Sequence, residues 1–459
     1  MINKTLWHWG CLCLSLSLTA CSSDMQRGKI ADKAQKESVA LIDKKETQWR
    51  QLNEVAPISY LTDLIQDAQL DRLIQQALTA NPDLQKTLLT LKASTWQLKS
   101  IHGDRLPSLD AGFSRNKTES VEASYNADIS ISWEADFWGK LANSEAAAAK
   151  SLAADQALYQ ESQDVLVANI IKSWLAMTSK QHLIDIESQR LAVLETNENR
   201  LLQRFRNGLN DLEELDEAQT ASSQSRADLA QYKEDLAIER RTLQRYLGSE
   251  NTLNIVPNKD YPRVNLTLDY LPEQSLQRRP DLKAAYLAIQ AADLNVSVAY
   301  KDMLPTISLS ATLSDTASSP SSALFASPIW SLLAQLTQPL YQGGKLKATV
   351  EIAKINTAEA YQDYRSTLLT AINEVETTIG QEKLLTQQLL NIQQALQSSQ
   401  KNLTRYEQKY RTGLVELSDL IRVQETTFNL AAELDNLLYL HLINRVDLGL
   451  ALGLGVKES

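Results

Sequence analysis

Glycine and proline are scarce in this chain of 459 residues, which contains 14 and 11 of them. Neither occurs from residue 140 to residue 207, so nothing in this stretch interrupts a continuous helix. With three cysteines the chain is not a disulfide-rich scaffold. No run after residue 21 approaches the roughly 18 consecutive apolar residues of a transmembrane helix. A net charge of −10 argues against a nucleic-acid-binding surface.

Signals for catalysis are also missing. Of the four histidines, His8 lies in the first twenty residues, and His102, His182 and His441 stand in unrelated contexts without a second ligand at metal spacing. No phosphate-binding loop, nucleophile elbow or zinc motif occurs. We therefore expect no enzyme activity, no metal site and no cofactor. The last three histidines are interpreted as surface or helix-packing residues.

The first twenty residues have the pattern of a secretory signal, in which Lys4 precedes the apolar stretch Leu12–Leu18. Leu18-Thr19-Ala20-Cys21 resembles a bacterial lipobox, so we expect cleavage before Cys21 and acylation of its thiol. An ordinary signal that happens to contain cysteine is the alternative. Serine rather than aspartate at residue 22 fits release to the outer membrane of a Gram-negative bacterium. Residues 21–60 are then an acylated N-terminal segment, whose composition predicts polar, irregular structure.

The second half of the chain repeats the first half. Pro82 in Asn-Pro-Asp-Leu recurs 198 residues later as Pro280 in Arg-Pro-Asp-Leu, and Gly208 recurs 205 residues later as Gly413. The seven extra residues fall after Pro305, which predicts a loop there because loops absorb insertions. Two copies of about 190 residues are too long for solenoid repeats. We divide the chain into repeat 1 (61–250), a linker (251–271) and repeat 2 (272–459).

Each repeat contains two long predicted helices joined at a glycine. Apolar residues between 158 and 205 recur mostly in steps of three, four or seven, as in a coiled-coil seam. Gly208 ends the first long helix of repeat 1, and Gly413 ends its counterpart in repeat 2. The predicted antiparallel hairpins are 140–247 and 345–448. Shorter helices are predicted to begin at Pro82 and Pro280.

Four segments alternate apolar with small polar residues, which is the period-two pattern of β-strands. These segments are residues 107–117, 126–136, 305–315 and 329–340. A soluble hairpin with one face on a core is one interpretation, but strands of about ten residues with aromatics near their ends favour a membrane barrel. Four strands cannot close a barrel, and lipid tolerates no open sheet edge. Several chains would therefore share one barrel, and three copies give twelve strands.

This layout resembles the TolC-type outer-membrane efflux proteins, in particular their lipoprotein branch. The resemblance covers nearly the whole mature chain and rests on the repeated Pro-Asp-Leu and Leu-Pro motifs, the segment 338–344 and the two tip glycines. It implies a membrane α/β fold with a trimeric, twelve-stranded transmembrane β-barrel, four strands per chain. A long periplasmic α-helical coiled-coil barrel would continue it. Residues 22–60, 250–271 and the C-terminal end would form an equatorial belt.

The resemblance also implies a function and partners. The homotrimer would be the passive exit duct of a tripartite efflux system for drugs or other small molecules. Its partners would be outer-membrane lipid, a periplasmic adaptor (membrane fusion protein) and an inner-membrane pump of the RND type, with no nucleic acid. Two alternatives stay open: the outer-membrane component of a type I protein secretion system, and a non-conducting structural coiled-coil lipoprotein.

Acidic residues gather after the tip glycines. The set after Gly208 is Asp211, Glu213, Glu214, Asp216 and Glu217. Favourable placement of acids at a helix N-terminus is one explanation. A threefold assembly would also turn acids at the axis into rings, which select cations. The resemblance matches Asp419 to an aperture acid, and we take Asp211, Glu214 and Glu217 as further aperture candidates. A second acid usual in the family is replaced by Arg422.

Two further roles are implied by the resemblance. Tyr410 matches a tyrosine that holds the tip closed, with Glu214 as the candidate partner. The arginine often found two residues after the second tip glycine is Val415 here, so that part of the latch is missing. Gly208-Leu209 and Gly413-Leu414 match the motif that contacts the adaptor.

Overall fold

The structure is a computed structural model that describes residues 29–50, 54–56, 60–209, 211–250, 257, 259–264, 266, 270–272 and 276–457. The signal, Cys21 and much of the linker lie outside the described residues. The chain divides into two compact units. Of the described residues, the sheet unit contains those within 29–41, 89–158 and 281–368, and the hairpin unit contains those within 42–88, 159–280 and 369–457.

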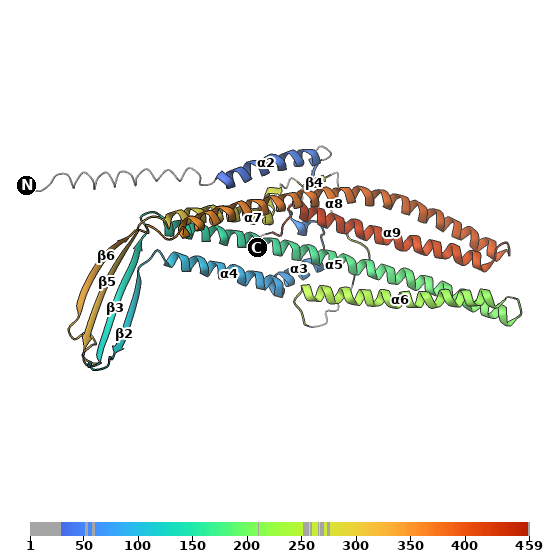
Figure 1. The fold of residues 1–459 in the computed structure, drawn as a ribbon. Helices are drawn as coiled ribbons and strands as arrows, with labels where there is room; N and C mark the ends of the chain where they lie inside the picture. The colour runs from blue at the N-terminus through green and yellow to red at the C-terminus, as the bar shows by residue number, and fades with distance from the viewer. Residues whose placement is uncertain are drawn as a thin grey trace, which may run out of the picture. The chain divides into compact units, whose positions relative to one another are not determined.

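The sheet unit contains four antiparallel strands, β2 (Ser108–Asn116), β3 (Ser124–Ala135), β5 (Thr306–Ala317) and β6 (Ile329–Thr337). Their order in the sheet is β2-β3-β5-β6, so β2 and β6 form the two edges (Figure 1). Each strand begins or ends within a few residues of its predicted bounds. The loop between β5 and β6, residues 318–328, lies in the region where the sequence carries its seven extra residues.

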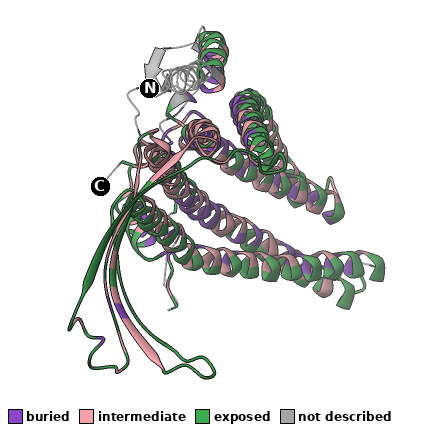
Figure 2. Cartoon of the chain, turned by 60° about the vertical axis from the view of Figure 1, so that its left-hand side comes forward, coloured by how far each residue is buried: buried purple, intermediate pink, exposed green. Residues whose placement is uncertain are grey.

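The strand register sorts side chains onto two chemically different faces. One cross-strand row joins Leu109, Ile131, Ala311 and Leu332. The neighbouring row on the other face joins Ser108, Ser132, Ser310 and Leu333, so small polar residues dominate there. The apolar face is not covered within the chain, since Leu332 is 71% exposed and Trp330 76%. Figure 2 shows the four strands almost entirely in the exposed and intermediate classes.

Two long antiparallel hairpins give the hairpin unit most of its residues (Figure 1). The first pairs α5 (Lys140–Arg206) with α6 (Leu212–Tyr246), and the second pairs α8 (Lys345–Arg411) with α9 (Leu417–Ala451). A core of bulky side chains lies in the middle of α5, at Val167, Ile170, Ile171, Trp174, Leu175 and Met177. No described helix has an apolar stretch long enough to cross a bilayer.

Shorter helices precede the strands of each repeat, namely α3 (Ala68–Ala80), α4 (Pro82–Gly103) and α7 (Pro280–Lys301). The first residues of α4 meet the end of α6, because Asn81 Nδ2 donates to the carbonyl of Tyr246 at 2.9 Å. Arg279 Nη1 donates in the same way to the carbonyl of Ala451 at 3.1 Å. These four residues occupy equivalent positions in the two repeats. The duplication therefore preserves the junction between the short helix and the returning helix.

The expectation of irregular structure before residue 60 is wrong for residues 29–50, which form the helix α2 (Lys29–Arg50). Its buried positions recur at helical spacing, but only two of them, Ile42 and Trp49, are bulky and apolar, since the others are Ala31, Ala34, Ser38 and Glu46. The apolar stripe is therefore weak in the sequence. Farther on, β1 (Glu54–Ala56) pairs in parallel with β4 (Tyr270–Pro272), and Tyr60 bridges to Gly455. The structure thus joins the three segments assigned to the belt.

Gly248 lies at the junction between α6 and α4, in a position that only glycine can occupy without strain. It has a φ of +61°, and a Cβ at this position would lie 2.2 Å from the carbonyl oxygen of Ala80. Gly413 has a similar φ of +72° but nothing within 4 Å of its Cβ position. Gly413→Ala is therefore a matched control that carries the left-handed backbone penalty without the clash.

We expect Gly248→Ala to lower the thermal unfolding temperature of the detergent-solubilised protein well below that of Gly413→Ala. The control should cost about 1–2 kcal/mol from the left-handed conformation, whereas the clash with main chain in Gly248→Ala adds to that cost. Circular dichroism at 222 nm measures both variants. Equal unfolding temperatures would show that the junction is loosely packed.

Candidate functional site at the helical tips

Both hairpin tips adopt the same glycine-terminated helix end. In repeat 1, Gly208 has a φ of +67°, and the amide of Leu209 donates to the carbonyl of Arg204 at 3.0 Å. In repeat 2, Gly413 has a φ of +72°, and the amide of Leu414 donates to the carbonyl of Lys409 at 2.9 Å. This hydrogen bond, from the residue after the tip glycine to the last turn of the helix, is characteristic of a Schellman motif. The tips thus present two copies of one local structure.

Each tip also exposes a leucine. Leu209 is 66% exposed and Leu414 is 74% exposed. A helix cap needs the glycine conformation but not an exposed apolar side chain, so capping does not explain the leucines. Space around the glycines is open, since nothing lies within 4 Å of the Cβ position of either one. Two of the four residues predicted to dock an adaptor therefore lie on accessible surface at each tip, Gly208 with Leu209 and Gly413 with Leu414.

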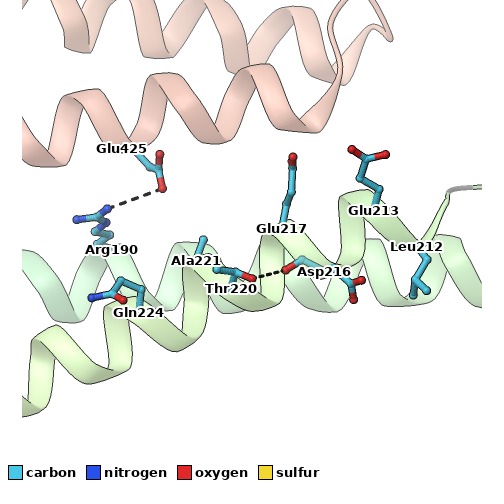
Figure 3. A pocket seen from close by; sticks show the side chains of 9 residues that line it. All are labelled: Arg190, Leu212, Glu213, Asp216, Glu217, Thr220, Ala221, Gln224 and Glu425. Atoms are coloured by element: carbon cyan, nitrogen blue, oxygen red, sulfur yellow. Dashed lines mark hydrogen bonds and ion pairs between the residues drawn. The ribbon is translucent and has the colours of Figure 1, made fainter.

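Acidic side chains line a groove beside the first tip (Figure 3). The groove measures about 790 Å³ and is lined by Arg190, Leu212, Glu213, Asp216, Glu217, Thr220, Ala221, Gln224 and Glu425. Glu213 and Glu217 point from α6 toward α9, where Glu425 points back. Its lining therefore has four carboxylates and one guanidinium. Arg190 is shared between two acids, lying 3.8 Å from both Glu187 and Glu425.

The other predicted aperture acids have different surroundings. Asp211 is the N-cap of α6 and accepts a hydrogen bond from the amide of Glu214 at 3.1 Å. Glu214 and Glu217 line a second groove of about 450 Å³, which also contains Arg422. Asp419 forms an ion pair with Arg422 in the first turn of α9. The arginine that replaces a family acid therefore partly neutralises the acid that matches the family pattern.

Tyr410 takes part in apolar packing between the two hairpins. It packs, partly buried, against a buried cluster that α5, α6 and α9 share: Leu201, Leu215, Ala218, Leu417 and Leu420. The cluster ties the hairpins together just behind the tips. The predicted latch between Tyr410 and Glu214 stays a prediction, and the packing places Tyr410 beside this cluster.

Buried polar contacts between α5 and α9 were not predicted from the sequence. Asn197 Nδ2 donates to Gln424 Oε1 at 2.9 Å, and the two residues are 2% and 8% exposed. Removing either side chain would leave the amide of the other buried without a hydrogen-bond partner, which lowers stability by about 1–3 kcal/mol. The internal repeat gave a hint of this pair, because both residue types recur at the equivalent positions: Asn197 corresponds to Asn402, and Gln424 corresponds to Gln219.

Two of the three histidines of the described chain lie in buried or half-buried polar clusters. His441 Nε2 lies 2.7 Å from Glu382 Oε1, and Arg445 Nε donates to the same oxygen at 2.8 Å. The equivalent positions in repeat 1 are apolar, Met177 and Leu236. This replacement of apolar by ionisable residues between the repeats is the sequence feature from which the cluster could have been predicted. Within the described ranges, no group of three His, Cys, Asp or Glu side chains could hold a metal ion.

His182 connects α5 to α9 and to the segment that follows α6. Its Nδ1 lies 2.6 Å from Asp435 Oδ1, and its Nε2 lies 2.8 Å from the carbonyl oxygen of Lys259. Asp435 also accepts hydrogen bonds from Tyr261 at 2.9 Å and Ser179 at 3.3 Å. The hydrogen bond to Asp435 raises the pKa of His182, and burial opposes that shift. The protonated imidazole is therefore favoured in the folded chain, where it bridges α5 and α9.

The chain belongs to a known family. The sequence profile of the family described as outer membrane efflux protein matches residues 73–249 and 271–454. This protein is an outer membrane efflux protein. The match spans both repeats, so the efflux function and outer-membrane location expected from the sequence are confirmed.

Curated relatives and solved structures agree with this assignment. The chain is 28% identical over 408 residues to the probable outer membrane lipoprotein SilC of Salmonella typhimurium, covering 85% of this chain and 87% of SilC. It is 26% identical over 400 residues to the cation efflux system protein CusC of Escherichia coli K12, with 85% and 87% covered. A crystal structure of CusC superposes with a TM-score of 0.78 at 23% identity, covering 87% of this chain and 98% of that one. The fold class expected from the sequence is confirmed.

The raised pKa of His182 predicts a pH-dependent stability with a definite sign. Stability from the charged contact is fully present below the ordinary histidine value of about 6.5 and is lost as pH rises through the raised value. We expect the unfolding temperature of the wild type to fall over this range, and His182→Gln to lose most of that fall. His102→Gln is the control, because His102 is 51% exposed in its contact with Glu145 and such pairs contribute little. If His182→Gln keeps the wild-type profile, the contact does not stabilise the hairpins.

Proposed function

We propose that this protein forms a homotrimer in the outer membrane and serves as the passive exit duct of a tripartite efflux system. The observation that carries this proposal is the four-stranded sheet, with its uncovered apolar face and two edge strands. In the described chain, β2 pairs only with β3 and β6 only with β5. Lipid demands that edge groups be paired, and about eight strands are the usual minimum for a barrel. Three copies supply twelve strands, which is above that minimum.

The long helices support the periplasmic part of the duct. Three copies of two hairpins would continue the strands as an α-helical barrel, with the glycine tips at its far end. We propose that the tips contact a periplasmic adaptor, which couples the duct to an inner-membrane pump of the RND type. The pump supplies the energy, and the duct itself catalyses no reaction. Acylation of Cys21 would add a lipid anchor.

Cations are favoured among the small molecules that such a duct could carry. The groove beside the first tip has four carboxylates against one guanidinium, and acidic rings select cations in pores. CusC is named for cation efflux. Neutral drugs would pass the same aperture without electrostatic help. The choice of cargo then belongs to the pump, while the tip chemistry sets which ions pass most readily.

The docking role of the leucines has a direct test. We expect Leu209→Glu with Leu414→Glu to abolish efflux-dependent resistance, because two charges would be forced into an apolar contact with the adaptor. Trimer yield should stay normal, since both leucines are exposed. The matched control is Gln203→Glu with Gln408→Glu, which adds the same charges at exposed, repeat-equivalent positions six residues before each leucine. Wild-type resistance in the leucine variant would remove the docking assignment.

The role of Asp419 in ion selectivity has a separate test. We expect Asp419→Asn to reduce cation preference, because it removes a carboxylate and leaves the charge of Arg422 uncompensated at the tip. Arg422→Gln should do the opposite and serves as the paired control. Reversal potential across a planar bilayer under a salt gradient measures both effects, which salt screens over a Debye length of about 8 Å at physiological strength. An unchanged reversal potential in Asp419→Asn would show that other residues line the aperture.

A further inference from the structure

The far end of the four-stranded sheet carries positive charge on its apolar face. Strands β2 and β3 are joined by residues 117–123 at the end of the sheet opposite to α4 and α5 (Figure 1). Arg115 on β2 and Lys117 just after the strand are both exposed. Arg115 follows Leu109 by six residues, and strand side chains alternate with a period of two, so both lie on the apolar face. A cation thus ends the apolar series along this strand.

The strand register places Arg115 at one edge of the apolar band. It is paired with Tyr125, which is paired in turn with Ala317. Ala317 lies ten residues from Ile307 near the other end of β5, and ten residues of strand rise about 33 Å. A tilt of about 40° reduces this rise to a height of about 25 Å, which is the height of the apolar band on membrane barrels. The row of Arg115 therefore lies where the hydrocarbon of a bilayer ends and the headgroups begin.

The surroundings of the two cations suit them to bind an anion. The guanidinium of Arg115 lies over the ring of Tyr125, 5.8 Å from its centroid, and the ring of Phe113 lies 6.3 Å from the same centroid. Lys117 Nζ donates to the carbonyl of Val121 at 2.9 Å. Neither cation forms an ion pair with the described part of the chain. The aromatic rings therefore position the arginine, and its charge is not neutralised.

The acid on the same face of the strands is withdrawn from the surface. Asp315 belongs to the row of Phe113, which is next to the row of Arg115. It is 6% exposed, and its Oδ2 accepts a hydrogen bond from the amide of Ser327 at 2.9 Å. The exposed charge on this face of the four strands is therefore positive.

We propose that Arg115 and Lys117 bind the phosphate groups of lipopolysaccharide, the phosphorylated glycolipid of the outer leaflet. A guanidinium binds phosphate through two parallel hydrogen bonds, and the nearby lysine adds a second charge. Repeat 2 has Leu313 at the position 198 residues after Arg115, so the fold does not require a cation there.

The side of the membrane selects this lipid. The helices extend into the periplasm, so the opposite end of the sheet, which carries Arg115, lies at the outer leaflet. Acyl chains of the bound glycolipid would lie along the apolar face beside β2. This inference rests on the proposed trimer in the outer membrane and adds one lipid site per copy.

Native mass spectrometry of the purified trimer in detergent tests this site. With bisphosphorylated lipid A as the probe, we expect bound lipid on the wild type and several-fold less on Arg115→Gln with Lys117→Gln. Lys92→Gln with Lys99→Gln is the matched control, since it removes two exposed lysines from α4, outside the sheet. The exchange Arg115→Lys with Lys117→Arg keeps both charges and should bind like the wild type.

The choice of probe separates phosphate recognition from other lipid contacts. Lipid A without its phosphates and phosphatidylglycerol should each bind several-fold less to the wild type. Equal binding of either one would overturn the assignment to a phosphorylated glycolipid. Binding should persist in EDTA, because side chains hold the phosphate directly. Loss of binding in EDTA would show a bridging divalent cation and overturn the direct contact.

The same spectra separate the lipid site from the trimer. Equal binding of bisphosphorylated lipid A to the wild-type trimer and to the trimer of Arg115→Gln with Lys117→Gln would overturn the inference and leave the proposed function standing. A monomeric mass of the wild type would contradict the proposed function itself. If the double variant does not assemble, Arg115→Gln alone tests the site, with the same expected loss and the same contradicting result.

Discussion

The backbone at the two edges of the four-stranded sheet constrains the rest of this protein. Strands β2 and β6 each have one neighbour in the described chain, while one face of the sheet carries exposed leucine, isoleucine and tryptophan. In lipid, an unpaired peptide group costs several kcal/mol, so an open edge of nine residues is not tolerated. In lipid, the backbone groups at the free edges of β2 and β6 can be paired only by strands of other copies of the chain. For a sheet that spans the outer membrane, oligomerisation follows from this one requirement.

Internal duplication supplies geometry for such an assembly. Equivalent residues make equivalent contacts in the two repeats, as at the junctions where Asn81 meets Tyr246 and Arg279 meets Ala451. The glycine tips also repeat, down to the hydrogen bond that closes each helix. Differences between repeats are equally informative. Repeat 2 buries His441 and Glu382 where repeat 1 has apolar side chains, so the two hairpins are similar in backbone and distinct in core chemistry.

Much of this fold could be predicted from the sequence, because its elements are specified locally. A glycine-free and proline-free stretch becomes α5, alternation of residue types becomes the strands, and Gly208 ends a helix as its chemistry requires. Elements specified by distant partners could not be predicted. The helix α2 buries alanine, serine and glutamate beside Ile42 and Trp49, so its apolar stripe is weak, and Asp435 lies 253 residues from His182. The acidic residues at the tips could be recognised in the sequence. Whether Asp419 pairs with Arg422 or faces an opening depends on how the helices pack, which the sequence does not specify locally. The contact Asn197–Gln424 was not predicted either, although the repeat offset retains both residue types as Asn402 and Gln219.

The central claim is that three copies enclose a continuous passage. Recording the current of the purified wild-type protein in a planar bilayer tests this claim most directly. We expect discrete unitary steps from inserted trimers, ohmic around zero voltage and independent of any energy source, with cations preferred over anions. Stable insertion of trimers that carry no unitary current would contradict it, and would favour a structural coiled-coil lipoprotein that bridges the envelope without conducting.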